Sequence, residues 1–412
     1  MATWFLIIIY LSFISLGIPD ALLGSAWPVM HRDIGASFGS AGLISMIVSV
    51  GTIVSSLASG SIIKRLGTGK ITLISCCLTA AALLGFSAAP SLAWLAVLAI
   101  PLGIGAGAVD SALNHYVASN YKAHHMSWLH CFWGLGAMMG PMIMSYFIAS
   151  RNSWRDGYST VSMIQWGLVI ILLVTLPLWS RVAKLHQASS EQKKRLVEYQ
   201  NVEENGNDRL YQTDAKRRHP IHIPGVKFTL AAFLCYCGVE ATVGLWGASY
   251  LVGAREITAD TAASWVSLYY GGITLGRLIT GFVTLKMNNR LLILIGQMTA
   301  IAGGIVLLLP LPDVCALIGM ILIGLGLAPI YPGLIHETPA RFGQENSARL
   351  IGYQMAVAYT GTTLLPPLFG LIASQVNVSL LPVMVLIFLI LMLMSSEQVN
   401  RILKPRENEG SI

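Results

Sequence analysis

The chain has 412 residues, of which 55% are hydrophobic and only 11% are charged, and its net charge is +7. An average soluble domain carries about 25% charged residues, so this chain lacks the charge needed to cover a soluble fold of its length. Its Lys and Arg residues lie scattered at the ends of apolar segments, without an aromatic-interleaved basic patch, which argues against a nucleic-acid partner. The composition predicts a protein embedded in a lipid bilayer.

The six cysteines form no CxxC motif and no Cys/His cluster with metal-binding spacing. Motifs of serine hydrolases, zinc proteases and nucleotide-binding loops are also absent from the sequence. We therefore expect no enzyme activity, no cofactor and no metal site. Without an ATP site, transport by this chain would have to draw on an ion or solute gradient.

Twelve apolar segments are each long enough to cross a membrane, which takes about 20 residues. The predicted spans are residues 4–28, 39–62, 71–89, 92–117, 126–149 and 160–180, followed by 225–252, 261–284, 290–309, 313–335, 347–374 and 379–396. This pattern predicts an all-α polytopic membrane protein. Its expected parts are a six-helix bundle at 1–180, a cytoplasmic linker at 181–224, a second six-helix bundle at 225–396 and a cytoplasmic tail at 397–412.

The distribution of basic residues predicts which side each loop faces. With both termini in the cytoplasm, 21 Lys and Arg residues fall on the inside and four on the outside. This is the direction of the positive-inside bias, so we expect a cell-membrane protein, in the inner or plasma membrane, with both termini cytoplasmic.

The two halves also share a local pattern. Gly51 and Gly60 precede a basic turn, and Gly272 and Gly281 have the same spacing before Lys286 and Arg290. Equal spacing at the same place in each half indicates a duplicated unit, as in carriers built from structural repeats. The halves are therefore expected to be pseudo-symmetric.

Ionisable side chains inside a membrane are costly and usually functional, and Asp20 is the first of these. It lies in LGIPDALLG, where Gly17 and Gly24 flank it and Pro19 loosens the helix. Burial in hydrocarbon favours the neutral form of a carboxyl group, so Asp20 suits a carrier that binds and releases protons. The structural alternative is a hydrogen bond between helices.

The fourth and fifth spans carry a second polar group. Asp110 and Asn114 are four residues apart and so share one helix face, where they can bind protons and the hydroxyl groups of a solute. His130 and Trp133 share a face of the fifth span, and His130 can gate or relay protons because it titrates near physiological pH. A satisfied polar residue near the membrane interface is the alternative for His130.

In the second half, Glu240 lies mid-span with the aromatic residues Tyr236 and Trp246 on the same helix. Arg277 lies in the next span and can pair with Glu240, since a buried pair is less costly than either charge alone. Arg277 then serves either as a structural lock or as a substrate contact. Further candidates for solute binding at mid-depth are Tyr269, Tyr331, Gln354 and Tyr359.

The pattern as a whole resembles the major facilitator superfamily. The loop GSIIKRLGTGK, with the basic residues Lys64, Arg65 and Lys70, is similar to that superfamily's G-x-x-x-D-R-x-G-R-[KR] signature, although Lys64 replaces the usual acid. The resemblance implies a major facilitator fold of 12 transmembrane helices in two pseudo-symmetric six-helix bundles. It also implies alternating access, with the halves rocking about a central site.

Within the superfamily the sequence is similar to the fucose permease type of sugar–proton symporters. Asp20 matches the acid of the first helix, and Asp110 with Asn114 matches the acid and amide of the fourth, with Asp in place of Glu. His130 and Trp133 stand where that family has Gln and another polar residue. The resemblance implies that protonation of Asp20 or Asp110 is linked to sugar binding.

We therefore predict a secondary active transporter that moves a hexose or related small polar solute together with a coupling cation. H⁺ is favoured over Na⁺ as that cation, and the protein is expected to function as a monomer. Asp20, Asp110 and Glu240 are the predicted proton-coupling residues. The alternatives are a proton-coupled efflux antiporter, a sodium-coupled sugar carrier and a sensor that signals through the linker. An intramembrane enzyme fits least, because no nucleophile–base pair is visible.

Overall fold

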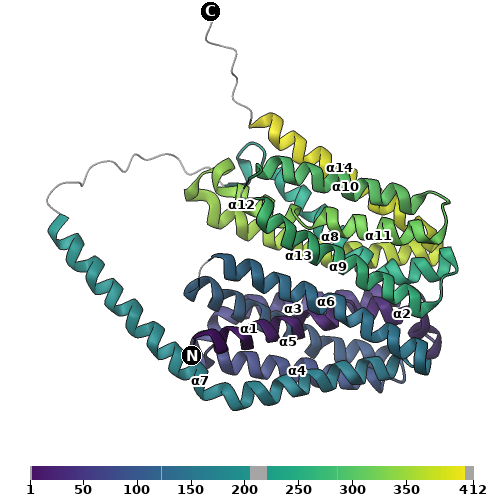
Figure 1. The fold of residues 1–412 in the computed structure, drawn as a ribbon, viewed down its shortest axis with the longest axis horizontal. Coiled ribbons are helices and arrows are strands. Elements are labelled where there is room, and N and C mark those ends of the chain that lie inside the picture. The colour runs from purple at the N-terminus through teal and green to yellow at the C-terminus, as the bar shows by residue number, and fades with distance from the viewer. Residues whose placement is uncertain (1, 122, 205–219, 285, 404–412) are drawn as a thin grey trace, which may run out of the picture.

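The computed structural model describes residues 2–121, 123–204, 220–284 and 286–403, and every regular element among them is a helix (Figure 1). The first half contains α1 (Ala2–Asp20), α2 (Leu22–Asp33), α3 (Ser40–Leu66), α4 (Thr68–Ser87), α5 (Leu92–Asn120), α6 (Ala123–Arg151) and α7 (Trp154–Glu204). The second half contains α8 (Val226–Arg255), α9 (Ala259–Val283), α10 (Asn289–Leu308), α11 (Asp313–Leu327), α12 (Ile330–Phe342), α13 (Gln344–Gln375) and α14 (Leu381–Ile402). The short 3₁₀ turns η1 (Pro220–His222) and η2 (Val378–Leu380) precede α8 and α14.

Two of the predicted spans are interrupted helices. The first span divides into α1 and α2 at Ala21, and the tenth divides into α11 and α12 at Ala328 and Pro329. Proline lacks the backbone N–H that continues a helix, and Pro19 and Pro329 lie at these breaks. The fourteen helices therefore make twelve spans, as the sequence predicts.

Eleven of the twelve spans are apolar and long enough to cross a membrane by composition alone. The remaining one is α9, which has 25 residues and carries Arg277 between apolar turns. A charged residue lowers the hydropathy of a span and marks it as a functional candidate. The chain is a multi-pass membrane protein.

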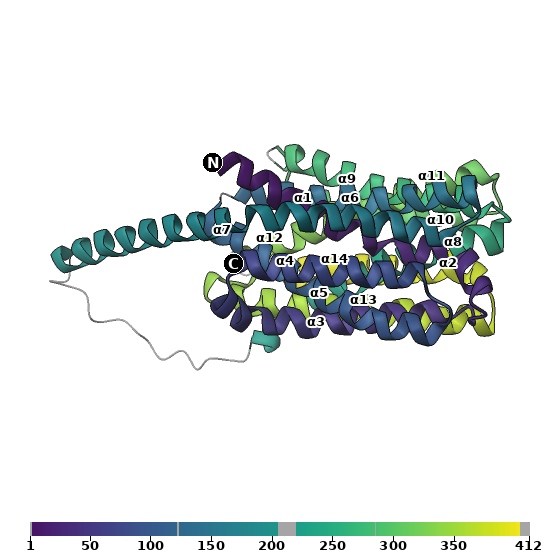
Figure 2. The ribbon, with the colours of Figure 1, turned by 90° about the horizontal axis from the view of Figure 1, so that it is seen from below.

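The largest departure from the predicted boundaries is α7, whose 51 residues include the sixth span and much of the predicted linker. It runs on from the predicted end at residue 180 to Glu204 and leaves the bundle (Figures 1 and 2). Residues 181–204 contain no Gly or Pro and many good helix formers, which explains the continuation. The rest of the linker, at 205–219, and the tail at 404–412 lie outside the described residues.

The helices form two sets, α1–α7 and α8–α14, which lie below and above each other in Figure 1. Two pairs of helices connect the sets along much of their length, α3 with α13 and α6 with α9. The α2 segment also packs against α8 and α9. Helices from both halves therefore line any site that lies between them.

At the end of the molecule that contains α2, which we call the closed end, the halves touch through small residues. A side chain at Gly24 would collide with the backbone of Gly244, and one at Gly42 with that of Pro367. Ser145 Oγ donates a hydrogen bond to the Asp260 carbonyl oxygen across the same interface (2.7 Å). Small residues allow helix backbones to approach this closely, and such packing drives the association of helices in a membrane.

The basic segment that resembles the superfamily signature includes the end of α3, the turn at Gly67 and the start of α4. Gly67 ends α3 with φ of +78°, a conformation that favours glycine. Gly69 lies against the Trp179 ring of α7 so closely that a side chain would collide with it. Gly67 thus allows the turn and Gly69 allows the close packing of α4 against α7, while Arg65 and Lys70 are exposed.

Candidate functional site: a polar cavity between the halves

A cavity of about 330 Å³ lies between the two halves. Four of the residues predicted as site residues line it, namely Asp20, Trp133, Glu240 and Tyr359. Both halves contribute to its wall, chiefly α1, α3, α4, α5 and α7 from the first and α8, α9 and α13 from the second. These four predicted residues thus reach one cavity from opposite halves.

Asp20 is the last residue of α1, directly before the break at Ala21, and its side chain is exposed to the cavity. Trp133 Nε1 of α6 donates a hydrogen bond to Asp20 Oδ2 (2.7 Å). The contact depends on Gly17, where any side chain would collide with the Trp133 backbone, so that α1 and α6 pack closely. No cationic side chain in the described part of the chain forms an ion pair with Asp20.

Glu240 of α8 is held differently, because its Oε1 lies 3.5 Å from Arg277 Nη2 of α9. The two side chains are only 16% and 14% exposed. Arg277 Nη2 also donates to the Tyr236 hydroxyl (3.4 Å). The predicted pairing of Glu240 with Arg277 is present, and Tyr236 supports it from one turn earlier on α8.

Trp133 connects the two charged groups. The guanidinium carbon of Arg277 lies 5.3 Å from the centre of the Trp133 ring, within the range of a cation–π contact. Tyr270 completes the group, with its ring edge-on to Trp133 at 6.5 Å between centres. The N–H of one indole thus binds the acid of the first half while its face meets the cation of the second.

Asp110 and Asn114 form a unit beside the cavity. Asn114 Nδ2 donates to Asp110 Oδ1 (2.9 Å), as their spacing on α5 allows. Ala106 and Val109 of the same helix line the cavity, whereas Asp110 itself is not among the lining residues. Asp110 and Glu240 nevertheless lie within electrostatic range of Asp20.

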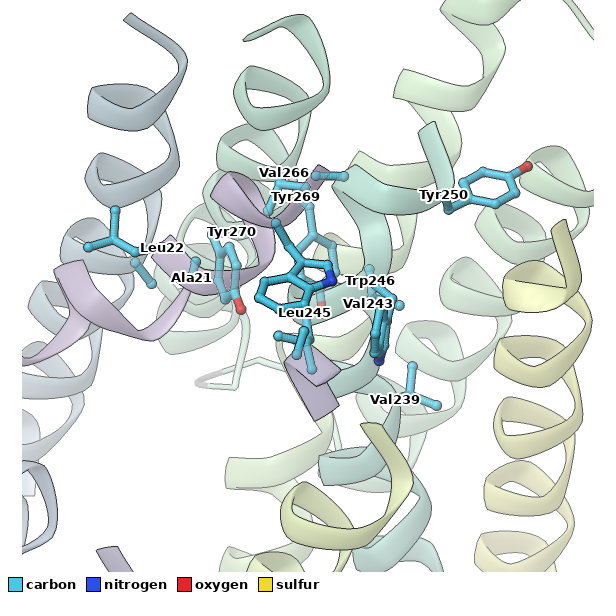
Figure 3. Close-up of a cluster of buried hydrophobic side chains, with 14 of the residues drawn as sticks. Ala21, Leu22, Val239, Val243, Leu245, Trp246, Tyr250, Val266, Tyr269 and Tyr270 are labelled. Carbon is cyan, nitrogen blue, oxygen red and sulfur yellow. The ribbon is translucent and has the colours of Figure 1, made fainter. Parts of the chain in front are cut away.

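Trp246, predicted to bind the solute, lies instead in the core at the closed end (Figure 3). Its Nε1 donates to the Pro366 carbonyl oxygen (2.8 Å), and its ring lies 5.1 Å from that of Phe38 in the first half. It is fully buried and absent from the cavity wall. In this structure Trp246 packs the halves together.

The remaining predicted solute contacts are also absent from the cavity lining. The Tyr269 hydroxyl donates to the main-chain oxygen of Glu240 (3.2 Å), and the Tyr331 hydroxyl points to Met355 Sδ (3.2 Å). Gln354 Nε2 donates to the Thr338 hydroxyl (2.8 Å). His130 faces the Phe13 ring at 6.0 Å between centres, and the side chain of Lys64 lies outside the described residues.

The polar lining residues that were missed in the sequence include Tyr270, Tyr158 and Gln165, besides several serines and threonines. Tyr270 is one position after the candidate Tyr269 and seven before Arg277, so a helical-face argument would have selected it. Gln165 is an amide within an apolar span, and a search restricted to charged groups passes over it. Tyr158 resembles any interfacial aromatic residue until its neighbours are known.

Comparison with known proteins decides the family. The Major Facilitator Superfamily pattern matches residues 9–335 of the chain. The chain belongs to the major facilitator superfamily. It is accordingly a transporter rather than an enzyme.

Two relatives each match more than three quarters of this chain. It is 23% identical over 407 residues to the "Bypass of stop codon protein 6" of Saccharomyces cerevisiae, which covers 90% of this chain and 77% of the relative. It is also 23% identical over 325 residues to the glucose/mannose transporter GlcP of Bacillus subtilis, covering 78% of this chain and 77% of the relative.

Solved structures share the fold. The xylose transporter XylE from E. coli in an inward open conformation superimposes with a TM-score of 0.71 at 13% identity, covering 98% of this chain and 100% of that chain. A D-xylose-proton symporter has a TM-score of 0.70 at 15% identity, covering 94% and 96%. At these identities the likeness establishes the architecture alone.

Proposed function

We propose that this chain is a proton-coupled symporter that carries a hexose or related small polar solute across the cell membrane by alternating access. The observation that carries the proposal is the Asp20 carboxylate, which is open to the cavity and held by one neutral donor, Trp133 Nε1. A sugar fits a cavity that combines polar and apolar side chains, and the relatives described above include transporters of glucose, mannose and xylose.

The coupling role falls on Asp20 because its charge has no cationic partner among the described residues. The charge of Glu240 is balanced by Arg277 at 3.5 Å, and a carboxylate in such an ion pair remains ionised. Proton binding to Asp20 changes the net charge of the cavity and weakens the acceptor for the Trp133 N–H. Since Trp133 also contacts Arg277 of the other half, this change can favour one arrangement of the halves over another.

The basic loops give the orientation of the closed end. With the Lys- and Arg-rich side in the cytoplasm, the closed end with α2 faces outward. Both termini then lie in the cytoplasm. Small-residue contacts such as Gly24 against Gly244 form the outer seal in this arrangement.

The test is uptake of D-glucose, D-mannose, D-xylose and L-fucose into proteoliposomes that contain the purified protein. An inward proton gradient, and not a sodium gradient alone, should drive accumulation of at least one of these sugars. Asp20→Asn should abolish accumulation while sugar exchange without a gradient persists. Asp33→Asn is the matched control, because Asp33 pairs with Arg155 at the rim, and it should transport normally.

Three results would contradict the proposal. Full gradient-driven accumulation by Asp20→Asn would remove that residue from coupling. Accumulation driven by sodium alone would instead support a sodium-coupled carrier. No uptake of any of the four sugars by the wild type would refute the sugar assignment.

A further inference from the structure

The cavity is not centred between the halves. Of its 28 lining residues, 21 belong to α1–α7 and only seven to α8–α14. From Asp20 it extends into the first bundle between α1, α4 and α7, where Ser15, Thr79 and Gln165 line it. We call this extension, bounded by Ser15, Thr79, Leu83, Phe86, Tyr158 and Gln165, the N-terminal lobe.

Tyr158 and Gln165 provide the α7 wall of the lobe. They are seven residues apart, which puts them on the same helix face about 10 Å apart along the axis. Both side chains are only 1% exposed. Gln165 Nε2 donates to the Ser15 carbonyl oxygen of α1 (2.8 Å), and the Tyr158 ring packs against that of Phe86 (5.5 Å between centres). Both side chains are thus held in fixed positions.

Each of these side chains keeps one polar atom unused. The Tyr158 hydroxyl and Gln165 Oε1 are buried without a hydrogen-bond partner in the described part of the chain. Neighbouring hydroxyls, in contrast, donate to the carbonyl oxygens of their own helices, as Ser12 does to Ile8 and Thr79 to Cys76. Buried polar groups normally have partners, so two fixed and unused atoms in one lobe indicate an absent partner.

We propose that the N-terminal lobe is a hydroxyl-binding subsite for the transported solute and a determinant of its specificity. Gln165 Oε1 can only accept a hydrogen bond, whereas the Tyr158 hydroxyl can donate or accept. The hydroxyl groups of a sugar or polyol can satisfy both, since one can pair with the Tyr158 hydroxyl and another can donate to Gln165 Oε1. Leu83 and Phe86 give the lobe an apolar surface for the C–H groups of the same solute.

The bounding residues of the lobe carry no formal charge, so it suits a neutral hydroxyl rather than an ammonium or carboxylate group. This inference rests on the proposed function, because it assigns part of the sugar to a position beyond Asp20. Two regions of the cavity then have different roles. The region around Asp20, Trp133 and Glu240 binds the proton and contacts the second half, while the lobe selects the solute.

The test uses Tyr158→Phe, which removes only the unused hydroxyl. With D-glucose as the probe in proteoliposomes, we expect KM to rise about tenfold or more, because a buried group of the solute loses its partner, while the maximal rate and proton coupling stay unchanged. Thr242→Val is the matched control. The Thr242 hydroxyl is also buried and unpartnered among the described residues, but it lies outside the cavity, so its removal should leave KM unchanged.

A series of monodeoxy-glucose analogues then identifies the contact. One analogue should bind the wild type about tenfold less tightly than glucose yet lose nothing more in Tyr158→Phe, because the two changes remove the same hydrogen bond. Gln165→Met should raise KM in the same direction. Thermal unfolding of each purified variant shows whether it is folded.

The outcomes separate the two proposals. If the wild type takes up D-glucose and KM is unchanged in Tyr158→Phe, the lobe holds only water and the subsite is refuted, while the proposed function stands. If Tyr158→Phe unfolds at a much lower temperature than the wild type, its hydroxyl has a structural role and the subsite is again refuted. If the wild type takes up no sugar, the proposed function fails and the subsite falls with it.

Discussion

Asp20 and Glu240 are both carboxylates on the wall of one cavity, but the two halves of the molecule treat them in opposite ways. The first half leaves Asp20 exposed to the cavity with a neutral indole N–H as its partner. The second half buries Glu240 against Arg277 and supports that cation with Tyr236. The position of a cation thus distinguishes a group suited to gain and lose a proton from one suited to remain charged.

This difference also explains why Trp133 lies between them. A tryptophan can donate one hydrogen bond from its edge and attract a cation to its face, so Trp133 contacts Asp20 and Arg277 together without itself carrying charge. The predictions below test the comparison, beginning with the ion pair.

The largest effect is expected for Arg277→Gln. It leaves the Glu240 charge buried without a cation, which costs roughly 3–5 kcal/mol when a buried pair is broken. The purified variant should therefore unfold at a markedly lower temperature than the wild type, and its yield should fall.

The double variant Glu240→Gln/Arg277→Gln removes both charges and should recover most of the lost stability. Asp20→Asn removes a charge with no cationic partner among the described residues, so it should not lower the unfolding temperature. Equal destabilisation by Asp20→Asn and Arg277→Gln would contradict the comparison.

A smaller effect is expected for Trp133→Phe, which retains an aromatic face towards Arg277 but loses the N–H that binds Asp20. A hydrogen bond to a charged group contributes about 1.5–3 kcal/mol, so proton-driven uptake should fall at least about tenfold. Initial rates in proteoliposomes measure this.

Trp94→Phe serves as the control for this change, since exposed Trp94 donates to the Gly85 carbonyl oxygen and does not line the cavity. Its uptake should match that of the wild type. Normal uptake by Trp133→Phe would show that the indole N–H has no part in coupling.

The closed end can be tested with Gly24→Ala. The added methyl group meets the backbone of Gly244, and overpacking of this kind costs roughly 1–3 kcal/mol. The substitution should open the closed end and slow transport. The opening can be measured as faster labelling, by an impermeant thiol reagent, of a cysteine introduced at Phe38. Gly167→Ala is the control, since no atom lies within 4 Å of the added group; faster labelling in both variants would refute the seal.

The smallest effect is expected at the rim, where Asp33 pairs with Arg155 at 3.1 Å and both side chains are well exposed. Exposed ion pairs contribute about 0–1 kcal/mol, so Asp33→Asn should lower the unfolding temperature only slightly. A fall in unfolding temperature as large as that of Arg277→Gln would mean that the exposure of an ion pair does not determine how much it stabilises the fold.

Much of the architecture could be predicted because it depends on local composition. The twelve spans follow from the length of apolar runs, and the pairing of Glu240 with Arg277 follows from the cost of burying either charge alone. The apolar part of the sixth span ends near Trp179, as predicted, but helix α7 continues through polar sequence to Glu204, and hydropathy does not detect that continuation.

The solute contacts were harder to predict. Trp246 and Tyr270 are both aromatic residues at mid-span, but one fills the core and the other lines the cavity. Only their orientation on the helix and the packing of α8 against α9 separate them. Gln165 and Tyr158 became candidates only when their unused polar atoms were known.

The sequence alone determined that this chain crosses the membrane many times, in two related halves, with acids in its interior, since a helix that spans hydrocarbon must be largely apolar and rarely carries charge. The tertiary structure alone decided that Asp20 meets Trp133 from 113 residues away, that the cavity extends into the first bundle and that Glu240 is paired. Those features depend on how helices pack side by side, and the spacing of residues along one helix carries no information about its neighbours.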